Sequence, residues 1–160
     1  MTQNWSNTVL VAFSALPKIL KELDSAFDFR LKTSYGSVHL KNGVSTERLV
    51  KEMLEINETK RKLVRLHYTV LSALDKLTAA DRAVLEARFI EGKTFQQAAD
   101  NEKVSLRTVF RRLDRARDAF LYALKHEGLD EKTYERDYLP LPYIRAIEER
   151  LARDAYFTVV

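Results

Sequence analysis

The chain has 160 residues, 46% of them hydrophobic, and its 27 Lys and Arg against 23 Asp and Glu give a formal net charge of +4. This length supports one hydrophobic core or two small helical units and excludes a large multidomain enzyme. The absence of cysteine excludes disulfides and thiolate metal sites and suits a reducing compartment, so we expect a cytoplasmic protein. Only four glycines and three prolines, with abundant helix-forming residues, predict an all-α fold.

A first amphipathic helix is predicted from apolar residues that recur at three- and four-residue steps between Leu16 and Phe27. We expect it to begin near Ser14, with Pro17 in the first turn, where the missing N–H of proline is tolerated. The apolar run over residues 9–16 is short, follows no basic segment and is interrupted by Pro17. It therefore suits neither a signal peptide nor a membrane span, and we expect no membrane association.

A loop or a short hairpin over residues 29–43 leads to a second, longer predicted helix. Gly36 and Gly43 interrupt the periodicity of the first segment, and both alternatives stay open. Ser45-Thr46-Glu47 is a helix start signal, and no Gly or Pro follows it until Gly92. The pattern predicts one long helix with a seam, which is a stripe of residues along one side spaced alternately four and three positions apart. The seam consists of Leu49, Met53, Ile56, Lys60, Leu63, His67, Val70 and Leu74.

This seam has two interpretations. It packs against the apolar stripe of the first helix, which is the interpretation we favour, or it forms a homodimeric coiled coil. Lys60 and His67 at seam positions weaken a long coiled-coil dimer, whereas a dimer would let a small DNA-binding module contact two half-sites. We therefore predict an N-terminal helical region, residues 1–76, that serves packing or dimerisation.

Three capped helices are predicted between residues 77 and 126, because a hydroxyl residue precedes each apolar pattern. In chain order, the caps are Thr78, Thr94 and Ser105, and the helices end at Glu91-Gly92, near Asp100 and near Lys125. Asp81 adds a carboxylate that can also satisfy early backbone amides of the first of these helices. The second and third helices, joined by a tight turn, are typical of a helix-turn-helix domain.

The positive charge of the chain is concentrated in the last of these helices. Residues 105–117 contain five arginines and one acidic residue, Asp114, so the rest of the chain holds 22 basic and 22 acidic residues. A local excess of this kind indicates a phosphate-binding element, whereas a generally basic surface would spread the charge along the chain. The alternative is a solvated amphipathic helix whose arginines pair with Asp114 and Asp118.

The helical period gives this helix an inward and an outward face. The inward stripe, which we expect in the core, consists of Val109, Leu113, Ala116 and Phe120. We expect Arg107 and Arg111 to contact base edges in the major groove, with the Phe110 ring against a thymine methyl group. The later arginines are candidates for phosphate contacts, namely Arg112, Arg115 and Arg117.

Residues 77–120 resemble the promoter-reading C-terminal domain of bacterial sigma factors, over about a quarter of the chain. The most specific matches are Asp81-Arg82-x-Val84-Leu85, Arg88-Phe89-x-Glu91-Gly92, Thr94 with Ala98-Ala99, and Val104-Ser105 followed by Thr108-Val109 and Arg112-Leu113-x-Arg115-Ala116. The resemblance implies a last helix that reads an upstream promoter element and a domain that docks on RNA polymerase. The resemblance and the helical period together give the residues that we expect to contact the DNA backbone. They are Thr94, Ser105, Leu106, Thr108, Arg112, Arg115 and Arg117.

The chain departs from this family in two respects. Lys103 stands where the family has a glycine in the turn, and Glu102 precedes it where the family has an apolar residue. A residue other than glycine tolerates a left-handed turn at modest cost, so we expect the fold to survive with a more polar loop. No aromatic-rich, promoter-melting domain precedes Leu77, so the pattern is closer to small stand-alone regulators, including those of phages and prophages.

No catalytic, metal or cofactor site is predicted elsewhere. His39, His67 and His126 lie far apart without an acidic companion at ligand spacing, so we interpret them as structural. The glycines are too few for a phosphate-cradling loop, and no serine lies in a nucleophile-elbow context. We therefore expect neither an enzyme nor a cofactor, and we expect isolated aromatics such as Trp5 and Tyr68 to anchor a core or an interface.

A C-terminal extension is predicted over residues 127–160. It begins with a polar, acidic stretch to Asp137, after which Leu139-Pro140-Leu141-Pro142 leads into a last amphipathic helix. The apolar positions of that helix are Ile144, Ile147 and Leu151. The tail over residues 156–160 is apolar and β-prone, and we expect it to dock on another surface.

These patterns predict a sequence-specific, DNA-binding transcription regulator that binds double-stranded DNA, and the resemblance implies RNA polymerase as a further partner. The alternative is a protein-interaction adaptor that keeps the sigma-like fold and binds a protein in place of DNA. A salt-dependent DNA complex distinguishes the first function, and a protein complex insensitive to loss of the arginines distinguishes the second.

Overall fold

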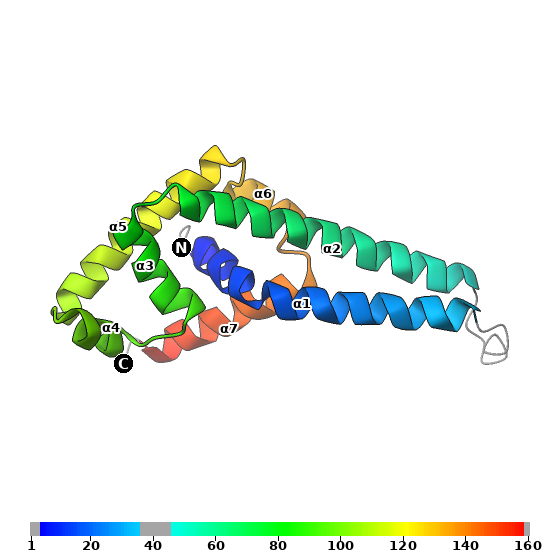
Figure 1. Ribbon diagram of the computed structural model, residues 1–160, viewed down its shortest axis with the longest axis horizontal. Coiled ribbons are helices and arrows are strands. Elements are labelled where there is room, and N and C mark those ends of the chain that lie inside the picture. Colours follow the sequence, from blue (N-terminus) through cyan, green and yellow to red (C-terminus); the bar gives the residue numbers. More distant parts are fainter. Residues whose placement is uncertain (1–3, 36–45, 159–160) are drawn as a thin grey trace. The chain divides into compact units, whose positions relative to one another are not determined.

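The computed structural model describes residues 4–35 and 46–158, which are helical almost throughout (Figure 1). The elements are α1 (Asn4–Tyr35), α2 (Thr46–Asp75), α3 (Ala79–Leu85), a π-helical turn η2 (Glu86–Ile90), α4 (Phe95–Glu102), α5 (Leu106–His126), α6 (Glu131–Asp137) and α7 (Pro142–Thr158). Within these described ranges the chain forms no strand. The predicted all-α fold is therefore confirmed.

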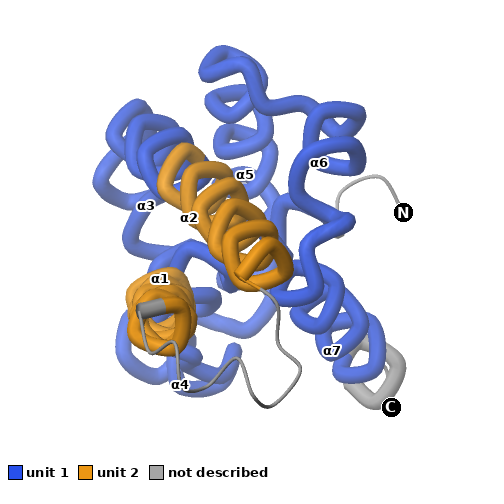
Figure 2. The backbone as a smooth tube through the Cα atoms, turned by 90° about the vertical axis from the view of Figure 1, so that its right-hand side faces the viewer, with its two compact units in different colours: residues 1–14, 66–160 blue, residues 15–65 orange. Residues whose placement is uncertain are grey.

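The chain divides into two compact units (Figure 2). Unit 1 combines residues 1–14 with residues 66–160, and unit 2 consists of residues 15–65. Helices α1 and α2 each contribute one part to unit 1 and the other to unit 2. The two units group residues that pack together, whatever their distance along the chain. The domain boundaries that we expect after residues 76 and 126 stay a prediction.

Helix α1 is longer at both ends than the sequence predicted. It begins at Asn4 instead of near Ser14, which places Pro17 in the helix interior. The cause of the earlier start is burial. The apolar run over residues 9–16, which we did not include in the predicted helix as a whole, is part of α1, and its Val9 and Leu10 are fully buried. The helix also continues to Tyr35, so residues 29–35 form neither a loop nor a hairpin. Residues 36–43 of that prediction lie outside the described residues.

Unit 2 is formed by residues 15–35 of α1 and residues 46–65 of α2. Its buried apolar residues come from both segments, namely Leu16, Ile19, Leu23, Leu49 and Leu63. Two ion pairs connect the segments, one between Arg30 Nε and Glu52 Oε2 at 2.8 Å and one between Lys60 and Asp24. The helix start at Thr46 and the single long helix are confirmed. The contacts support packing of the seam within one chain, while homodimerisation stays a prediction.

The core of unit 1 joins the first residues of α1 to the C-terminal helices. The ring centroids of Trp5 and Tyr134 are 5.4 Å apart, and the Tyr134 hydroxyl donates a hydrogen bond to Glu148 Oε2 at 2.6 Å. Burial is the main cause that raises the pKa of Tyr134, so the hydroxyl stays a donor at neutral pH. Around these residues, the buried side chains include Phe120, Leu124, Leu129, Tyr138 and Ile144.

The C-terminal region differs from the sequence pattern in two respects. The polar stretch contains a short helix, α6, because Asp130 accepts a hydrogen bond from the Thr133 amide at 2.8 Å and Tyr134 is buried in the core. The tail predicted as β-prone is helical as far as Thr158, since α7 continues through it. The predicted last helix with buried Ile144 and Ile147 is confirmed.

Candidate DNA interface

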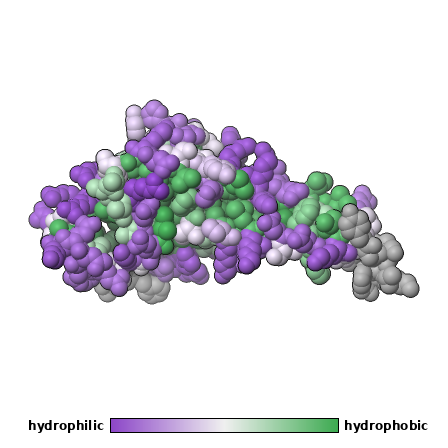
Figure 3. Space-filling model, in the orientation of Figure 1, coloured by the Kyte–Doolittle hydropathy of each residue, from purple (hydrophilic) through white to green (hydrophobic). Residues whose placement is uncertain are grey.

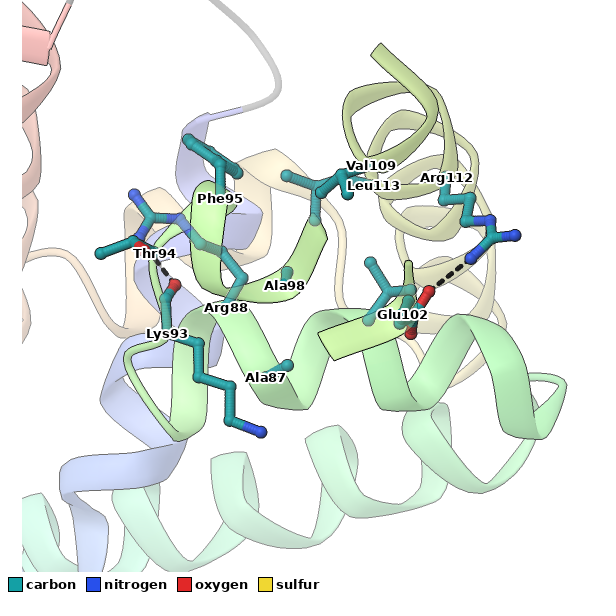
Figure 4. Close-up of a pocket in the computed structure, with 11 residues that line it drawn as sticks. Ala87, Arg88, Lys93, Thr94, Phe95, Ala98, Glu102, Val109, Arg112 and Leu113 are labelled. Atoms are coloured by element: carbon teal, nitrogen blue, oxygen red, sulfur yellow. Dashed lines mark hydrogen bonds and ion pairs between the residues drawn. The ribbon is translucent and has the colours of Figure 1, made fainter. Parts of the chain in front are cut away.

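The candidate interface is on α4 and α5, which pack on α3 and η2. Thr78 caps α3 by accepting a hydrogen bond from the Asp81 amide at 3.2 Å, as its sequence predicted. After η2, Gly92 takes a left-handed φ of 71°, which lets the chain leave the helix. Arg88 fixes the turn, because its guanidinium donates to the Lys93 carbonyl at 3.2 Å and lies 4.3 Å above the Phe95 ring (Figure 4).

Helix α4 begins with a capping box, in which Thr94 accepts from the Gln97 amide and Gln97 accepts from the Thr94 amide. Lys103 ends the helix with φ 56° and ψ 43°, so the left-handed non-glycine turn is confirmed. The Val104 amide then donates to the Ala99 carbonyl at 3.0 Å, which closes the turn. The predicted tight connection between two capped helices is therefore present.

Helix α5 has the predicted register. Ser105 caps it by accepting from the Thr108 amide at 3.2 Å, and the helix packs on both α3 and α4. The four residues expected on the inward stripe are all buried, namely Val109, Leu113, Ala116 and Phe120. A cavity of only about 30 Å³ remains between these helices, with Ala98, Val109 and Leu113 among its lining (Figure 4). Because the inward stripe is buried and α5 packs on α3 and α4, the outward face of α5 is held in a defined direction.

The outward face presents its first two turns to solvent. Arg107 and Arg111 are exposed, and within the described part of the chain neither makes a hydrogen bond or an ion pair. Phe110 is 45% exposed, with its ring centroid 4.7 Å from that of Phe95. Leu106, at the start of the helix, is also exposed. All the residues expected to contact bases therefore lie together on one accessible surface.

The arginines expected to contact phosphate differ from one another. Arg112 pairs with Glu102 at the end of α4, and Arg115 Nη2 lies 3.2 Å from Asp81 Oδ1 on α3. The Asp81 side chain is only 11% exposed, so its carboxylate serves Arg115, and the capping role that we predicted for it falls to Thr78. Sequence reasoning missed both acids as arginine partners, because each pair joins residues on different helices.

Arg117 is turned toward the protein. Its side chain is 20% exposed, its Nη1 lies 3.7 Å from Asp114 Oδ1, and its Nε is buried without a hydrogen-bond partner among the described residues. The pair with Asp114 is one that the alternative, a solvated amphipathic helix, predicted. Of the phosphate candidates, Arg115 is therefore the most accessible, with 69% of its side chain exposed.

A groove runs between α3 and α5 beside the outward face. Three guanidinium groups line it, from Arg111, Arg112 and Arg115, and its other lining residues are Ala80, Ala83, Val84 and Glu102. The visible surface over this end of unit 1 is mainly hydrophilic (Figure 3). Small side chains on one wall and guanidinium groups on the other would allow the sugar-phosphate backbone of a nucleic acid to approach closely.

The two histidines of the described residues, His67 and His126, do not line this groove. His67 stacks on Phe13 with ring centroids 5.1 Å apart, and the His126 ring lies edge-on to Tyr122 at 4.9 Å. His39 is outside the described residues. In the described part of the chain, no helix combines the length and the hydrophobicity needed to cross a membrane.

Comparison with protein families agrees with this geometry. Residues 67–120 match the model of the family described as Sigma-70, region 4, over about a third of the chain. Neither the curated proteins nor the solved structures gave a match. The match begins in the last turns of α2, where Val70 and Leu74 are buried. Domains of this family bind DNA and RNA polymerase in transcription, and the chain carries a helix-turn-helix domain of the sigma-70 region 4 type.

Proposed function

We propose that the protein is a sequence-specific transcription regulator whose helix α5 enters the major groove of DNA. The observation that carries this proposal is the pair Arg107 and Arg111, which are exposed, unpaired among the described residues and one helical turn apart. They lie opposite the buried stripe, so the groove can approach them without disturbing the core. Their planar guanidinium groups match the paired acceptors of guanine, and each such contact discriminates between bases.

The surroundings of α5 would hold the DNA backbone. Ser105 and Leu106 lie at the N-terminal end of the helix, where free amides and the helix dipole favour phosphate. Thr94 lies at the N-terminal end of α4, which favours phosphate for the same reason. The Thr108 hydroxyl already makes a hydrogen bond with the Ser105 hydroxyl at 3.0 Å, so it is less available to a phosphate. Arg115 adds an accessible charge on the groove side. These contacts would fix the register of the helix and leave sequence reading to Arg107 and Arg111.

One helix gives limited affinity, so we expect help from a second contact. A second copy of the chain would supply a second half-site, and RNA polymerase would supply a protein surface beside the promoter. We favour RNA polymerase, because unit 2 has intramolecular contacts that account for much of the apolar seam. A regulator of this kind would act in the cytoplasm of a bacterial cell, including one that carries a phage.

The adaptor function keeps one specific observation in its favour. Acidic residues neutralise Arg112 and Arg115, and Arg117 is largely buried, so α5 offers fewer free charges than its sequence indicated. An adaptor of this type would bind its protein partner equally well when Arg107 and Arg111 are replaced by alanine.

Selection of bound fragments from a random duplex pool tests the proposal. The intact chain should enrich a defined motif, and Arg107→Ala with Arg111→Ala should abolish the enrichment. Arg150→Ala, on the exposed side of α7, removes one positive charge outside the domain and should leave the motif unchanged. Enrichment of no motif by the intact chain, alone and with RNA polymerase added, would contradict a DNA-reading function.

A further inference from the structure

The ion pair between Glu102 and Arg112 joins the two helices of the helix-turn-helix at the edge of the DNA-facing groove. Glu102 is the last residue of α4, and Arg112 lies in the second turn of α5. Both side chains are partly exposed, at 45% and 41% respectively. Both also line the groove that Arg111 and Arg115 line. The carboxylate therefore lies where a DNA phosphate would come closest to Arg112.

A carboxylate and a phosphate compete for the same guanidinium. Each offers two oxygens at the spacing that the arginine fork accepts. Ion pairs that are open to solvent are weak, so a phosphate can displace Glu102 from Arg112. After displacement, the negative charge of Glu102 remains beside the phosphate and repels it. Arg112 therefore contributes less to DNA affinity than an unpaired arginine in the same position would.

The neighbouring pair, Arg115 with Asp81, has a different character. The Asp81 side chain is 11% exposed while Arg115 is 69% exposed, so the acid lies beneath the arginine and orients it toward solvent. Glu102 instead shares the solvent-facing edge with Arg112. Of these two carboxylates, Glu102 is therefore the one that stands in the path of an arriving phosphate.

We propose that Glu102 is an internal competitor of DNA phosphate, which neutralises Arg112 in the free protein and lowers the affinity of the domain for every duplex alike. The inference rests on the proposed DNA-binding function and adds a residue that sets the strength of binding. Base preference is unaffected by this residue, because phosphate contacts carry no sequence information. Because phosphate contacts alone then bind DNA more weakly, DNA binding by the domain depends more on the base contacts and on a partner.

The test measures affinities of the full-length chain for a fluorescent selected duplex and for a scrambled duplex over a series of salt concentrations. Glu102→Gln should tighten both complexes by roughly three- to tenfold at low salt and steepen the salt slope by up to about one. The matched control is Asp100→Asn, which removes the same charge from the same helix, where Asp100 contacts Gln96 and no arginine of α5. The control should tighten binding by a clearly smaller factor.

A second comparison isolates the pair itself. In an Arg112→Ala background, Glu102→Gln should have no larger effect than Asp100→Asn, because the arginine it would release is absent. Circular dichroism melting of each variant verifies that it is folded, and Glu102→Ala replaces Glu102→Gln where the latter melts early.

The outcomes separate the competitor role from the function on which it rests. Wild-type binding with equal effects of Glu102→Gln and Asp100→Asn would overturn the competitor and leave the DNA-binding function standing. An effect of Glu102→Gln that persists without Arg112 would do the same. A failure of the wild type and all variants to bind any duplex, alone or with RNA polymerase, would overturn both.

Discussion

The rings of Phe95 and Phe110 are 4.7 Å apart and inclined by 53°, so the first helix of the helix-turn-helix holds an outward-facing side chain of the second. Arg88 lies 4.3 Å from the centroid of the Phe95 ring and also binds the Lys93 carbonyl. A continuous set of contacts therefore runs from η2 through α4 to the outward face of α5. It holds Phe110 in place, which under the proposed function would lower the entropy lost on binding DNA.

Replacing Phe95 with alanine should weaken both the fold and the reading of DNA. The change removes an aromatic pair and a cation–π contact, so we expect a loss of about 1 to 3 kcal/mol in the free energy of unfolding. Base preference near Phe110 should also broaden. Urea denaturation and duplex selection measure the two effects, with Phe29→Ala as the control because that ring is 69% exposed in unit 2. Unchanged stability would show that the ring contacts are not made in solution.

Single alanine substitutions at Arg107 and Arg111 should each cost roughly 1 to 3 kcal/mol on the preferred duplex. Each variant should also lose discrimination at one base position, because a bidentate contact to guanine is removed. Competition titrations with single-base variants of the site measure both effects. Equal weakening on every duplex would instead assign these two arginines to phosphate.

Arg115 and Arg117 should behave differently, although the sequence grouped them. Arg115→Ala should lower the slope of log affinity against log salt by about one, because its exposed guanidinium neutralises a phosphate. Arg117→Ala should leave the slope unchanged and alter thermal stability instead, because most of that side chain is covered by protein. Equal slopes for wild type and Arg115→Ala would remove Arg115 from the interface. A reduced slope for Arg117→Ala would show that its side chain leaves the protein surface on binding.

The assembly state follows from the contacts within unit 2. Because Leu63 is fully buried and Lys60 pairs with Asp24 of the same chain, we expect the intact protein to sediment as a monomer at micromolar concentration. Analytical ultracentrifugation over a range of concentrations measures this directly. A dimer would revive the coiled-coil interpretation of the α2 seam, and the two half-sites of a palindromic duplex would then be the expected target.

The parts of the fold that were predictable depend on signals close together in the chain. Thr78, Thr94 and Ser105 mark helix starts by contacts only three residues long, and the buried stripe of α5 follows from helical period alone. The start of α1 was missed because Pro17 suggested a first turn, whereas burial of the preceding apolar run extends the helix past it. Burial of an apolar run depends on distant partners, which local periodicity does not reveal.

The sequence predicted which residues of the candidate site face outward, but it did not predict which of its arginines are paired with acidic residues. Helical period placed Arg107 and Arg111 outward, and the structure finds them exposed. The acids that neutralise Arg112 and Arg115 come from other helices, and such pairs depend on the crossing of helices that the sequence pattern leaves open. The departure of Glu102 from the family pattern was a signal at this position, because an acidic residue there requires a partner or solvent.

The contact between Trp5 and Tyr134 has a consequence for synthesis of the protein on the ribosome. At about 5 to 20 residues per second, Tyr134 is made roughly 6 to 26 seconds after Trp5. During that interval the apolar beginning of α1 has no permanent partner from α6 or α7. A nascent chain would therefore expose this segment to chaperones or to other nascent chains until α6 and its Tyr134 have been synthesised.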